Sequence, residues 1–347
     1  MIERDRTSDA AIRAIVADDC ESKRSALREA IDGDPSVSVV ATVGSGEELV
    51  AEAVRTRPTV VVMGVGMETL GGLAAIQELM ATRPTPIVVV GSNGDADRAF
   101  GMAALKRGAL DYAAARDRGI MDAALLLSRV RVCARVSVIT HPRSRSRETP
   151  PAARLPRPGQ YKIIGIAVST GGPPALMQLL SRLPADLPVP VVIVQHIPEG
   201  FSQGLTSWLN AGCSLKVVEA RDGMIPEGGT VYIAPAGKHL VVTRERRMRL
   251  EEAGFDECFH KPSADVMLRS LAETYGSGVI GVIMTGMGRD GVDGMRAIQD
   301  AGGLTLAQDE ASSLIYGMNK IAADAGWISH IVPLGGIAER LTTIVRP

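Results

Sequence analysis

The sequence predicts an α/β protein built from two doubly wound parallel sheets, and three observations support this fold class. The chain has 347 residues, and at about 150 residues per domain this length indicates two domains. Short runs rich in Val and Ile alternate with longer amphipathic stretches, which is the pattern of parallel strands joined by helices. The alternation stops once, in a segment rich in Pro and Arg, and then resumes.

The first half holds five predicted strands and five predicted helices, a number typical of a flavodoxin-like doubly wound domain. The expected strands are 12–17, 36–43, 59–63, 86–91 and 109–114, and the expected helices are 20–31, 46–56, 73–83, 96–108 and 119–136. We expect residues 11–137 to form this domain, with right-handed crossovers between its strands.

A linker is expected at residues 138–160. Its segment 141–160 holds five prolines, five arginines and hardly any apolar side chain. Proline favours extended polyproline conformation, so the segment is expected to be a semi-rigid spacer. Its arginines are interpreted as a solvated basic run, with docking to an acidic partner as the alternative.

The second half, residues 161–346, is expected to form the second α/β domain. Short strands with Gly-containing turns between residues 214 and 250 predict a small antiparallel insertion. The remaining expected strands are 161–169, 189–196, 279–285 and 304–309, and the expected helices are 173–183, 201–212, 263–276, 292–302, 312–326 and 337–345.

The composition excludes several classes of protein. A net charge of −1 and an aromatic share of 3 % argue against nucleic acid and anionic membranes as partners. The first ten residues contain no apolar segment, and no run approaches the roughly 18 apolar residues of a membrane span. We expect a cytoplasmic protein without membrane insertion. The four cysteines lack the spacing of a zinc site or a disulfide framework and are expected to be reduced thiols: Cys20, Cys133, Cys213 and Cys258.

Three candidate catalytic residues follow predicted parallel strands, where open α/β sheets collect functional groups. The first is Ser169, at a strand-to-helix junction. The backbone N–H groups of Thr170, Gly171 and Gly172 could point at a developing oxyanion beside its hydroxyl. The alternative is that Ser169 only caps the following helix.

The second candidate is His196, which ends a predicted strand. Its ordinary pKa near 6.5 suits a general base at neutral pH. A single histidine is more often structural, and the other four have no neighbouring nucleophile in the sequence: His141, His239, His260 and His330.

The third candidate is Asp290, inside the glycine turn formed by Gly286, Gly288 and Gly291. This GxGxxG turn admits a dinucleotide-binding alternative, because it follows a predicted strand and opens a predicted helix. A carboxylate inside the turn would repel a pyrophosphate, which disfavours that alternative. If Asp290 instead accepts a hydrogen bond from His196, the residues alone predict a Ser-His-Asp hydrolase.

Six further segments allow a closer identification: IIGIAVSTGGPPAL, VVIVQHIPEGFSQGL, VYIAPAGKHLVV, HKPSADVML, GVIMTGMGRDGVDGM and LAQDEASSLIYGM. In this order they resemble the catalytic domain of the chemotaxis protein-glutamate methylesterase family, CheB. The first half resembles the response-regulator receiver domain of the same family. The resemblance spans nearly the whole chain.

The resemblance implies a role for each candidate residue. Ser169 would be the nucleophile, His196 the general base and acid, and Asp290 the residue that orients His196. Thr170 and Met287 match the part of the family motif associated with the oxyanion pocket. The implied reaction is hydrolysis of glutamate γ-methyl esters on methyl-accepting chemotaxis receptors, with deamidation of receptor glutamines, and it implies no cofactor. Other proteins of the chemosensory array are possible partners.

The receiver-like half departs from the family pattern at the residues that handle phosphate. Asp18 and Asp19 match the acidic pair that holds Mg²⁺ in receivers, and we expect them to form a solvated strand end in which little metal binding remains. Gly64 stands where the phosphate-accepting aspartate belongs, Gly91 at the hydroxyl position and Ala115 at the lysine position. We therefore predict a pseudo-receiver that is not phosphorylated.

Two questions stay open at the level of sequence. The pseudo-receiver either leaves the esterase constitutively active or inhibits it until a partner protein binds. The rival to an enzyme is a non-catalytic regulatory scaffold of a chemosensory array, in which the three candidate residues are idle.

Overall fold

The structure is a computed structural model, and it describes residues 12–68, 71–92, 94–114, 123–134, 160–252 and 260–346. The chain divides into two compact units, residues 1–140 and 141–347. The predicted Pro/Arg-rich linker at 138–160 lies outside the described residues except for Gln160.

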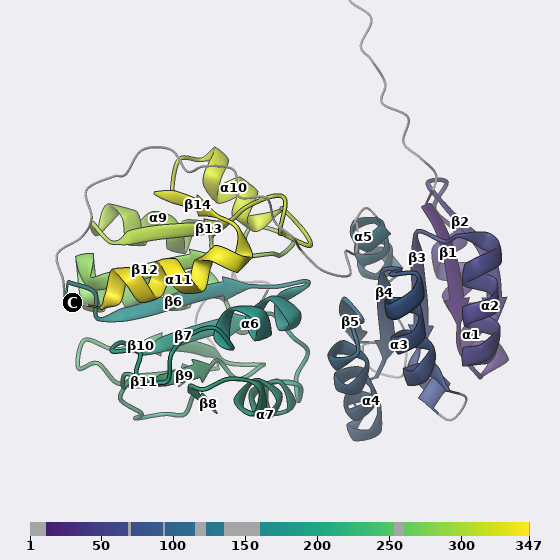
Figure 1. The fold of residues 1–347 in the computed structure, drawn as a ribbon, viewed down its shortest axis with the longest axis horizontal. Coiled ribbons are helices and arrows are strands. Elements are labelled where there is room, and N and C mark those ends of the chain that lie inside the picture. Colours follow the sequence, from purple (N-terminus) through teal and green to yellow (C-terminus); the bar gives the residue numbers. More distant parts are fainter. Residues whose placement is uncertain are drawn as a thin grey trace, which may run out of the picture. The chain divides into compact units, whose positions relative to one another are not determined.

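The N-terminal unit is a five-stranded parallel sheet in the order β2-β1-β3-β4-β5 (Figure 1). This arrangement confirms the doubly wound fold predicted for this half. Its strands are β1 (Ile12–Ala17), β2 (Val37–Val43), β3 (Val60–Gly64), β4 (Ile87–Gly91) and β5 (Asp111–Ala114). Its helices are α1 (Glu21–Asp32), α2 (Gly46–Thr56), α3 (Gly72–Thr82), α4 (Asp95–Lys106) and α5 (Ala123–Ala134), with a 3-10 turn η1 at Val65–Glu68.

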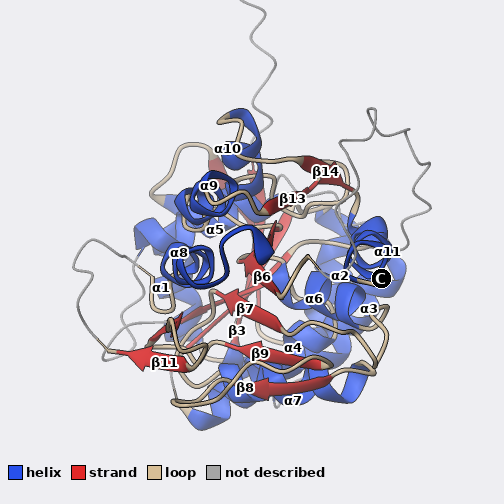
Figure 2. Ribbon diagram, turned by 90° about the vertical axis from the view of Figure 1, so that its left-hand side faces the viewer, coloured by secondary structure: helices blue, strands red, loops and turns tan. Residues whose placement is uncertain are grey.

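The C-terminal unit is built on a seven-stranded parallel sheet in the order β14-β13-β12-β6-β7-β9-β8. Its strands are β6 (Ile163–Val168), β7 (Val191–Gln195), β8 (Lys216–Glu219), β9 (Thr230–Ile233), β12 (Val279–Ile283), β13 (Leu304–Gln308) and β14 (His330–Val332). Its helices are α6 (Gly172–Leu180), α7 (Ser202–Gly212), α8 (Ala264–Tyr275), α9 (Val292–Asp300), α10 (Met318–Asp324) and α11 (Leu334–Val345), with a 3-10 turn η3 at Gly276–Gly278. Figure 2 shows α8 and α9 on one side of this sheet and α6, α7 and α11 on the other.

The chain changes direction in this sheet at β6. From β6 it runs outward through β7 to one edge, and it later returns to β12 on the other side of β6. Because all three strands are parallel, the segments that follow them emerge at one edge of the sheet, at a topological switch point. Ligand and catalytic groups of open α/β sheets gather at such a point.

Several sequence expectations differ from the structure. The strand β14 was not expected, and α11 begins at Leu334 and not at residue 337. Residues 230–233 were expected in the antiparallel insertion, but β9 pairs in parallel with β7 and β8, and the antiparallel pair is β10 (His239–Val242) with β11 (Met248–Glu251). Alternation and turns predict a strand without indicating its neighbours. The helix expected at 312–326 is shorter, because α10 begins at Met318 and the residues before it form a loop.

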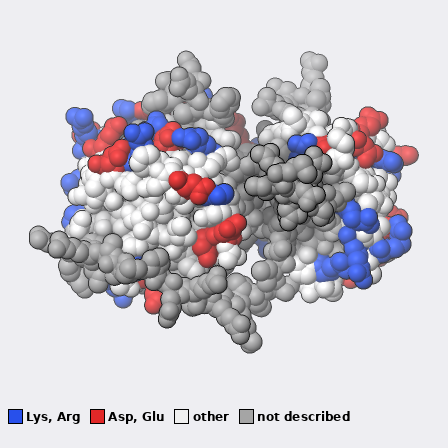
Figure 3. Space-filling model, turned by 90° about the horizontal axis from the view of Figure 1, so that it is seen from above, with Lys and Arg blue, Asp and Glu red and all other residues white. Residues whose placement is uncertain are grey.

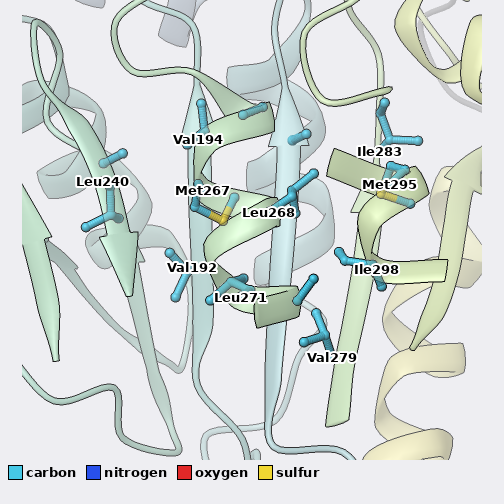
Figure 4. Close-up of a cluster of buried hydrophobic side chains, with 14 of the residues drawn as sticks. Val192, Val194, Leu240, Met267, Leu268, Leu271, Val279, Ile283, Met295 and Ile298 are labelled. Carbon is cyan, nitrogen blue, oxygen red and sulfur yellow. The ribbon is translucent and has the colours of Figure 1, made fainter. Parts of the chain in front are cut away.

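A tightly packed helix fixes one side of this switch point. Gly165 on β6 lies directly under α8, where an added Cβ would sit 2.7 Å from Leu271 Cδ1 and 2.8 Å from Leu268 Cδ2. Figure 4 shows Leu268, Leu271 and Met267 of α8 among the buried side chains of the strands. This close packing sets the position of the N-terminus of α8 relative to the sheet.

The C-terminal unit carries charges of both signs on the face drawn in Figure 3. On the face of the C-terminal unit in Figure 3, acidic and basic side chains lie next to one another among uncharged residues. No helix in the described ranges is long and apolar enough to cross a lipid bilayer.

Candidate active site

The three residues selected from the sequence follow three neighbouring strands. Ser169 comes directly after β6, His196 directly after β7, and Asp290 in the loop between β12 and α9. Ser169 is 8 % exposed, and the side chains of His196 and Asp290 are 10 % and 12 % exposed. The topology therefore brings a hydroxyl, an imidazole and a carboxylate to one edge of the sheet.

His196 and Asp290 form a direct pair. The distance between His196 Nε2 and Asp290 Oδ2 is 2.7 Å. The other ring nitrogen, Nδ1, is buried and has no hydrogen-bond partner among the described residues. With an ionised Asp290, Nε2 carries the proton of a neutral imidazole and Nδ1 carries the lone pair. The nitrogen able to accept a proton is thus Nδ1.

The N-terminus of α8 binds the Asp290 carboxylate. The Ser263 hydroxyl donates to Oδ1 at 2.7 Å, the Ala264 N–H donates to Oδ2 at 2.7 Å, and the Asp265 N–H donates to Oδ1 at 3.0 Å. A helix N-terminus favours an anion through its unpaired N–H groups and its dipole. Burial alone would raise the pKa of Asp290, but the hydrogen bond and charge of His196 and these N–H groups outweigh it and hold the pKa well below its ordinary value.

Sequence reasoning missed three residues around this pair. Ser263 caps α8, and its own N–H donates to Nδ1 of the fully buried His239 at 3.2 Å. Burial lowers the pKa of His239, which keeps it neutral and able to accept this bond. The ring of His260 stacks on that of His196, with centroids 4.5 Å apart. His260 and Ser263 lie in the motif HKPSADVML, which could have pointed to them. His239 and His260 were not selected because they have no nucleophile beside them in the sequence.

Backbone hydrogen bonds fix the turn that carries Ser169. Its N–H donates to Thr285 O at 3.0 Å, and its carbonyl accepts from the Gly172 N–H at 2.8 Å and from Gln195 Nε2 at 2.9 Å. The N-cap of α6 is Gly171, with φ of +77°. The interpretation of Ser169 as the helix cap is therefore wrong, and so is the expectation that the Gly172 N–H points at an oxyanion, because that group is already bonded.

The two residues expected at the oxyanion pocket lie on the same edge of the sheet. Thr170 follows Ser169 and is 9 % exposed, and Met287 is half-buried in the loop after β12. The glycine turn 286–291 begins against Ser169, since a Cβ on Gly286 would sit 2.7 Å from Ser169 Cβ. Gly286 packs on Ser169, and the Asp290 carboxylate is bound to the N-terminus of α8. The negative charge of Asp290 therefore stays in the turn and disfavours a bound pyrophosphate.

The acidic site of the N-terminal unit is filled by its own side chains. A Cβ on Gly64 would lie 1.6 Å from Asp18 Oδ2, and one on Gly66 would lie 2.0 Å from Asp19 Oδ1. Asp18 accepts from the Cys20 N–H at 2.9 Å and is 1 % exposed, so the expected solvated strand end is wrong for Asp18 and holds for the exposed Asp19. Burial raises the pKa of Asp18 above its ordinary value. Within the described ranges, no three acidic, His or Cys side chains gather as metal ligands.

Tyr112 occupies the space beside Gly91, the residue that stands where receivers carry a hydroxyl group. A Cβ on Gly91 would lie 2.4 Å from the Tyr112 Oη, which donates to Ser92 O at 2.7 Å. Tyr112 is 2 % exposed, and burial raises its pKa. Ala115, expected at the lysine position, lies outside the described residues.

Asp265 gives the site a measurable pH dependence of stability. Burial raises its pKa to about 6, and the negative charges of Asp290 and Asp293 add to this effect, although the Gly294 N–H donates to it. Because the folded-state pKa exceeds the ordinary value of 3.8, the folded state binds the extra proton, and stability falls as pH rises from about 4 to 6.

We expect Asp265→Asn to remove this loss of stability while keeping an acceptor for Gly294. The gain in unfolding free energy over wild type should be about 1 kcal/mol larger at pH 7.5 than at pH 5, measured by urea unfolding. Asp300→Asn, at an exposed position on α9, should show the same difference from wild type at both pH values. An equal gain at both pH values for Asp265→Asn would contradict the assignment.

Known proteins resemble the chain in both halves. A family model described as CheB methylesterase matches residues 164–341, and one described as response regulator receiver domain matches residues 14–114. A protein-glutamate methylesterase/protein-glutamine glutaminase of Paramagnetospirillum magneticum is 39 % identical over 348 residues, covering 96 % of each chain. One of Myxococcus xanthus is 40 % identical over 354 residues, covering 96 % of this chain and 97 % of its own. The crystal structure of the CheB methylesterase catalytic domain of Thermotoga maritima has a TM-score of 0.51 and 36 % identity, over 53 % of this chain and 99 % of that one.

Proposed function

The chain belongs to the CheB methylesterase family, and on this basis we propose that it hydrolyses glutamate γ-methyl esters on chemoreceptors and deamidates receptor glutamines. The relatives that span nearly the whole chain bear both activities in their names. The observation that carries the proposal for this chain is the His196–Asp290 pair at the switch point of the sheet, where Ser169 follows the strand between theirs. We assign residues 11–137 to the pseudo-receiver, 138–160 to the linker and 161–346 to the catalytic domain. We also propose that the protein acts in the cytoplasm.

The proposed mechanism uses the two nitrogens of His196 separately. Ser169 Oγ attacks the ester carbonyl carbon while Nδ1 of His196 accepts the hydroxyl proton. The proton then passes to the leaving oxygen, methanol departs, and an acyl-enzyme remains on Ser169. Water attacks this ester by the reverse proton transfer and releases glutamate; with a glutamine substrate the leaving group is ammonia. Asp290 stabilises the imidazolium through Nε2, and N–H groups near Thr170 and Met287 bind the oxyanion.

The reaction changes the charge of the receptor. An ester is neutral, and its hydrolysis restores a carboxylate, which increases repulsion between packed receptor helices. We propose that the esterase resets receptor signalling in this way.

A serine-reactive fluorophosphonate tests whether the site is assembled. We expect the full-length chain to be labelled once, at Ser169, and Ser169→Ala to stay unlabelled. Ser181→Ala, which alters an exposed serine at the end of α6, should be labelled like wild type. Absence of labelling in folded wild-type protein would favour the non-catalytic scaffold.

The filled acidic site supports activity without phosphorylation. We expect no phosphate on wild-type protein incubated with acetyl phosphate and Mg²⁺, and none on Gly64→Asp. A new side chain at residue 64 has to displace the Asp18 carboxylate, whose Oδ2 it overlaps and whose Oδ1 accepts from the Cys20 N–H. In Gly64→Asp it also adds a second carboxylate beside a buried one. Intact-protein mass measures the added phosphate.

A receiver with its acceptor aspartate is the positive control for this assay, and Gly64→Ala shows the steric effect alone. Stoichiometric phosphate on the wild-type chain would contradict the pseudo-receiver, and stoichiometric phosphate on Gly64→Asp would contradict the inference that Asp18 blocks the site.

A further inference from the structure

We propose that Thr285 is a positioning residue for the oxyanion pocket, and that it acts by fixing the peptide between Thr170 and Gly171. The inference rests on the proposed function and adds a residue to it. Thr285 follows β12, is 1 % exposed and is not one of the groups expected to react.

Every polar group of Thr285 is engaged at the site. Its hydroxyl donates to Thr170 O at 3.0 Å and accepts from the Ile315 N–H at 2.9 Å. Its carbonyl accepts from the Ser169 N–H at 3.0 Å, and its N–H donates to Gln308 Oε1 at 3.0 Å. One buried residue therefore connects the nucleophile, the residue after it, and the loop between β13 and α10.

The hydroxyl determines where the Gly171 N–H points. In a planar trans peptide the C=O and N–H groups point in opposite directions. Because the Thr170 C=O is held toward the buried Thr285, the Gly171 N–H is directed away from it, at the N-cap of α6. No acceptor for this N–H is found within the described residues, and a helix N-terminus favours negative charge. The Gly171 N–H is thus available to a developing oxyanion.

The loop on the other side of the hydroxyl presses on the same peptide. The Gly286 N–H donates to Ile315 O at 3.1 Å. The neighbouring Leu314 packs against Gly171, where an added Cβ would lie 2.4 Å from Leu314 Cδ2. Removing the hydroxyl takes one hydrogen bond from Thr170 O and one from the Ile315 N–H, so the peptide and the loop that packs on it are both held less firmly.

The test compares Thr285→Val with a matched variant elsewhere in the sheet. Thr305 on β13 is also fully buried, and its hydroxyl also makes two hydrogen bonds. One joins it to the Ser329 hydroxyl at 3.0 Å, and in the other it accepts from the Ser329 N–H at 2.9 Å. It lies near the start of its strand, whereas the site lies beyond the strand ends. Thr305→Val therefore removes the same kind of contacts without reaching the nucleophile turn.

Methanol release is measured with full-length chains over a range of methylated receptor concentrations. We expect Thr285→Val to lower kcat and kcat/KM together by about ten- to a hundredfold with an unchanged KM, because a misplaced oxyanion donor acts only in the transition state. Thr285→Ser, which keeps the hydroxyl, should recover kcat to within about threefold of wild type, and Thr305→Val should stay within about twofold.

Thr285→Cys removes the branch methyl group, as Thr285→Ser does, and replaces the hydroxyl by a weak donor. It is the second variant if Thr285→Val does not fold, and we expect it also to lose kcat. Three results would overturn the inference. One is that Thr285→Val or Thr285→Cys has the same kcat as Thr305→Val. The others are that only KM changes, or that Thr285→Ser does not recover kcat. If wild type and Thr305→Val also release no methanol, the proposed function itself fails, and the inference fails with it.

Discussion

Replacing His196 with Gln is expected to lower methanol release by about ten-thousandfold or more. The amide of Gln can still donate to Asp290, but it has no nitrogen that accepts a proton near neutral pH. In the structure the unpartnered Nδ1 of His196 is the atom that would accept the Ser169 proton. The initial rate of methanol release from methylated receptor membranes measures the loss.

His330→Gln is the matched control, because His330 lies on β14 at the edge of the sheet. Its rate should equal that of wild type. If His196→Gln kept even a few per cent of the wild-type rate, His196 could not be the general base.

Replacing Asp290 with Asn is expected to cost about 10³- to 10⁴-fold in kcat. An amide in this place lacks the charge that stabilises the imidazolium. Its NH₂ group is a donor, so it cannot accept a hydrogen bond from His196 or from the N–H groups of α8 as the carboxylate oxygen does. Since the pKa of Asp290 lies well below its ordinary value, the wild-type carboxylate stays charged throughout the neutral range. The same methanol assay applies.

Asp293→Asn tests whether the effect is local. Asp293 lies in the first turn of α9, is 38 % exposed and pairs with Arg289, so its loss should leave kcat unchanged. Equal rates for Asp290→Asn and wild type would refute the role of Asp290.

Periodicity predicted most of the fold. The bounds expected for β1 and α2 are those observed, since both segments alternate or repeat with a clear period and end at turn residues. The same signal misplaced β9, because pairing partners depend on the whole sheet. Periodicity also predicted that α10 begins at residue 312, but tertiary contacts hold the residues before Met318 in a loop. The Ile315 N–H donates to the Thr285 hydroxyl, and an added Cβ on Gly317 would lie 2.5 Å from Gly286 O.

The site was predictable where a residue follows a parallel strand. Position alone selected Ser169, His196 and Asp290, and the structure contains the hydrogen bond that was expected between the last two; their catalytic roles stay a prediction. Ser263 and Thr285 could not be selected in this way, because their hydrogen bonds at the site are to residues 27 and 115 positions away.

In the N-terminal unit, the sequence shows which side chains are absent but not what occupies their place. Gly64 and Gly91 are visible as missing functional groups. Only the packing reveals that Asp18 and Tyr112 fill the space that these groups would need.

The most direct test of a serine methylesterase that needs no phosphorylation is methanol release from methylated receptor membranes, by full-length wild type and Ser169→Ala, with no phosphodonor added. Release by wild type that disappears in Ser169→Ala is the predicted result. No release by folded wild-type protein until a phosphodonor is supplied, or equal release by both chains, would contradict the account.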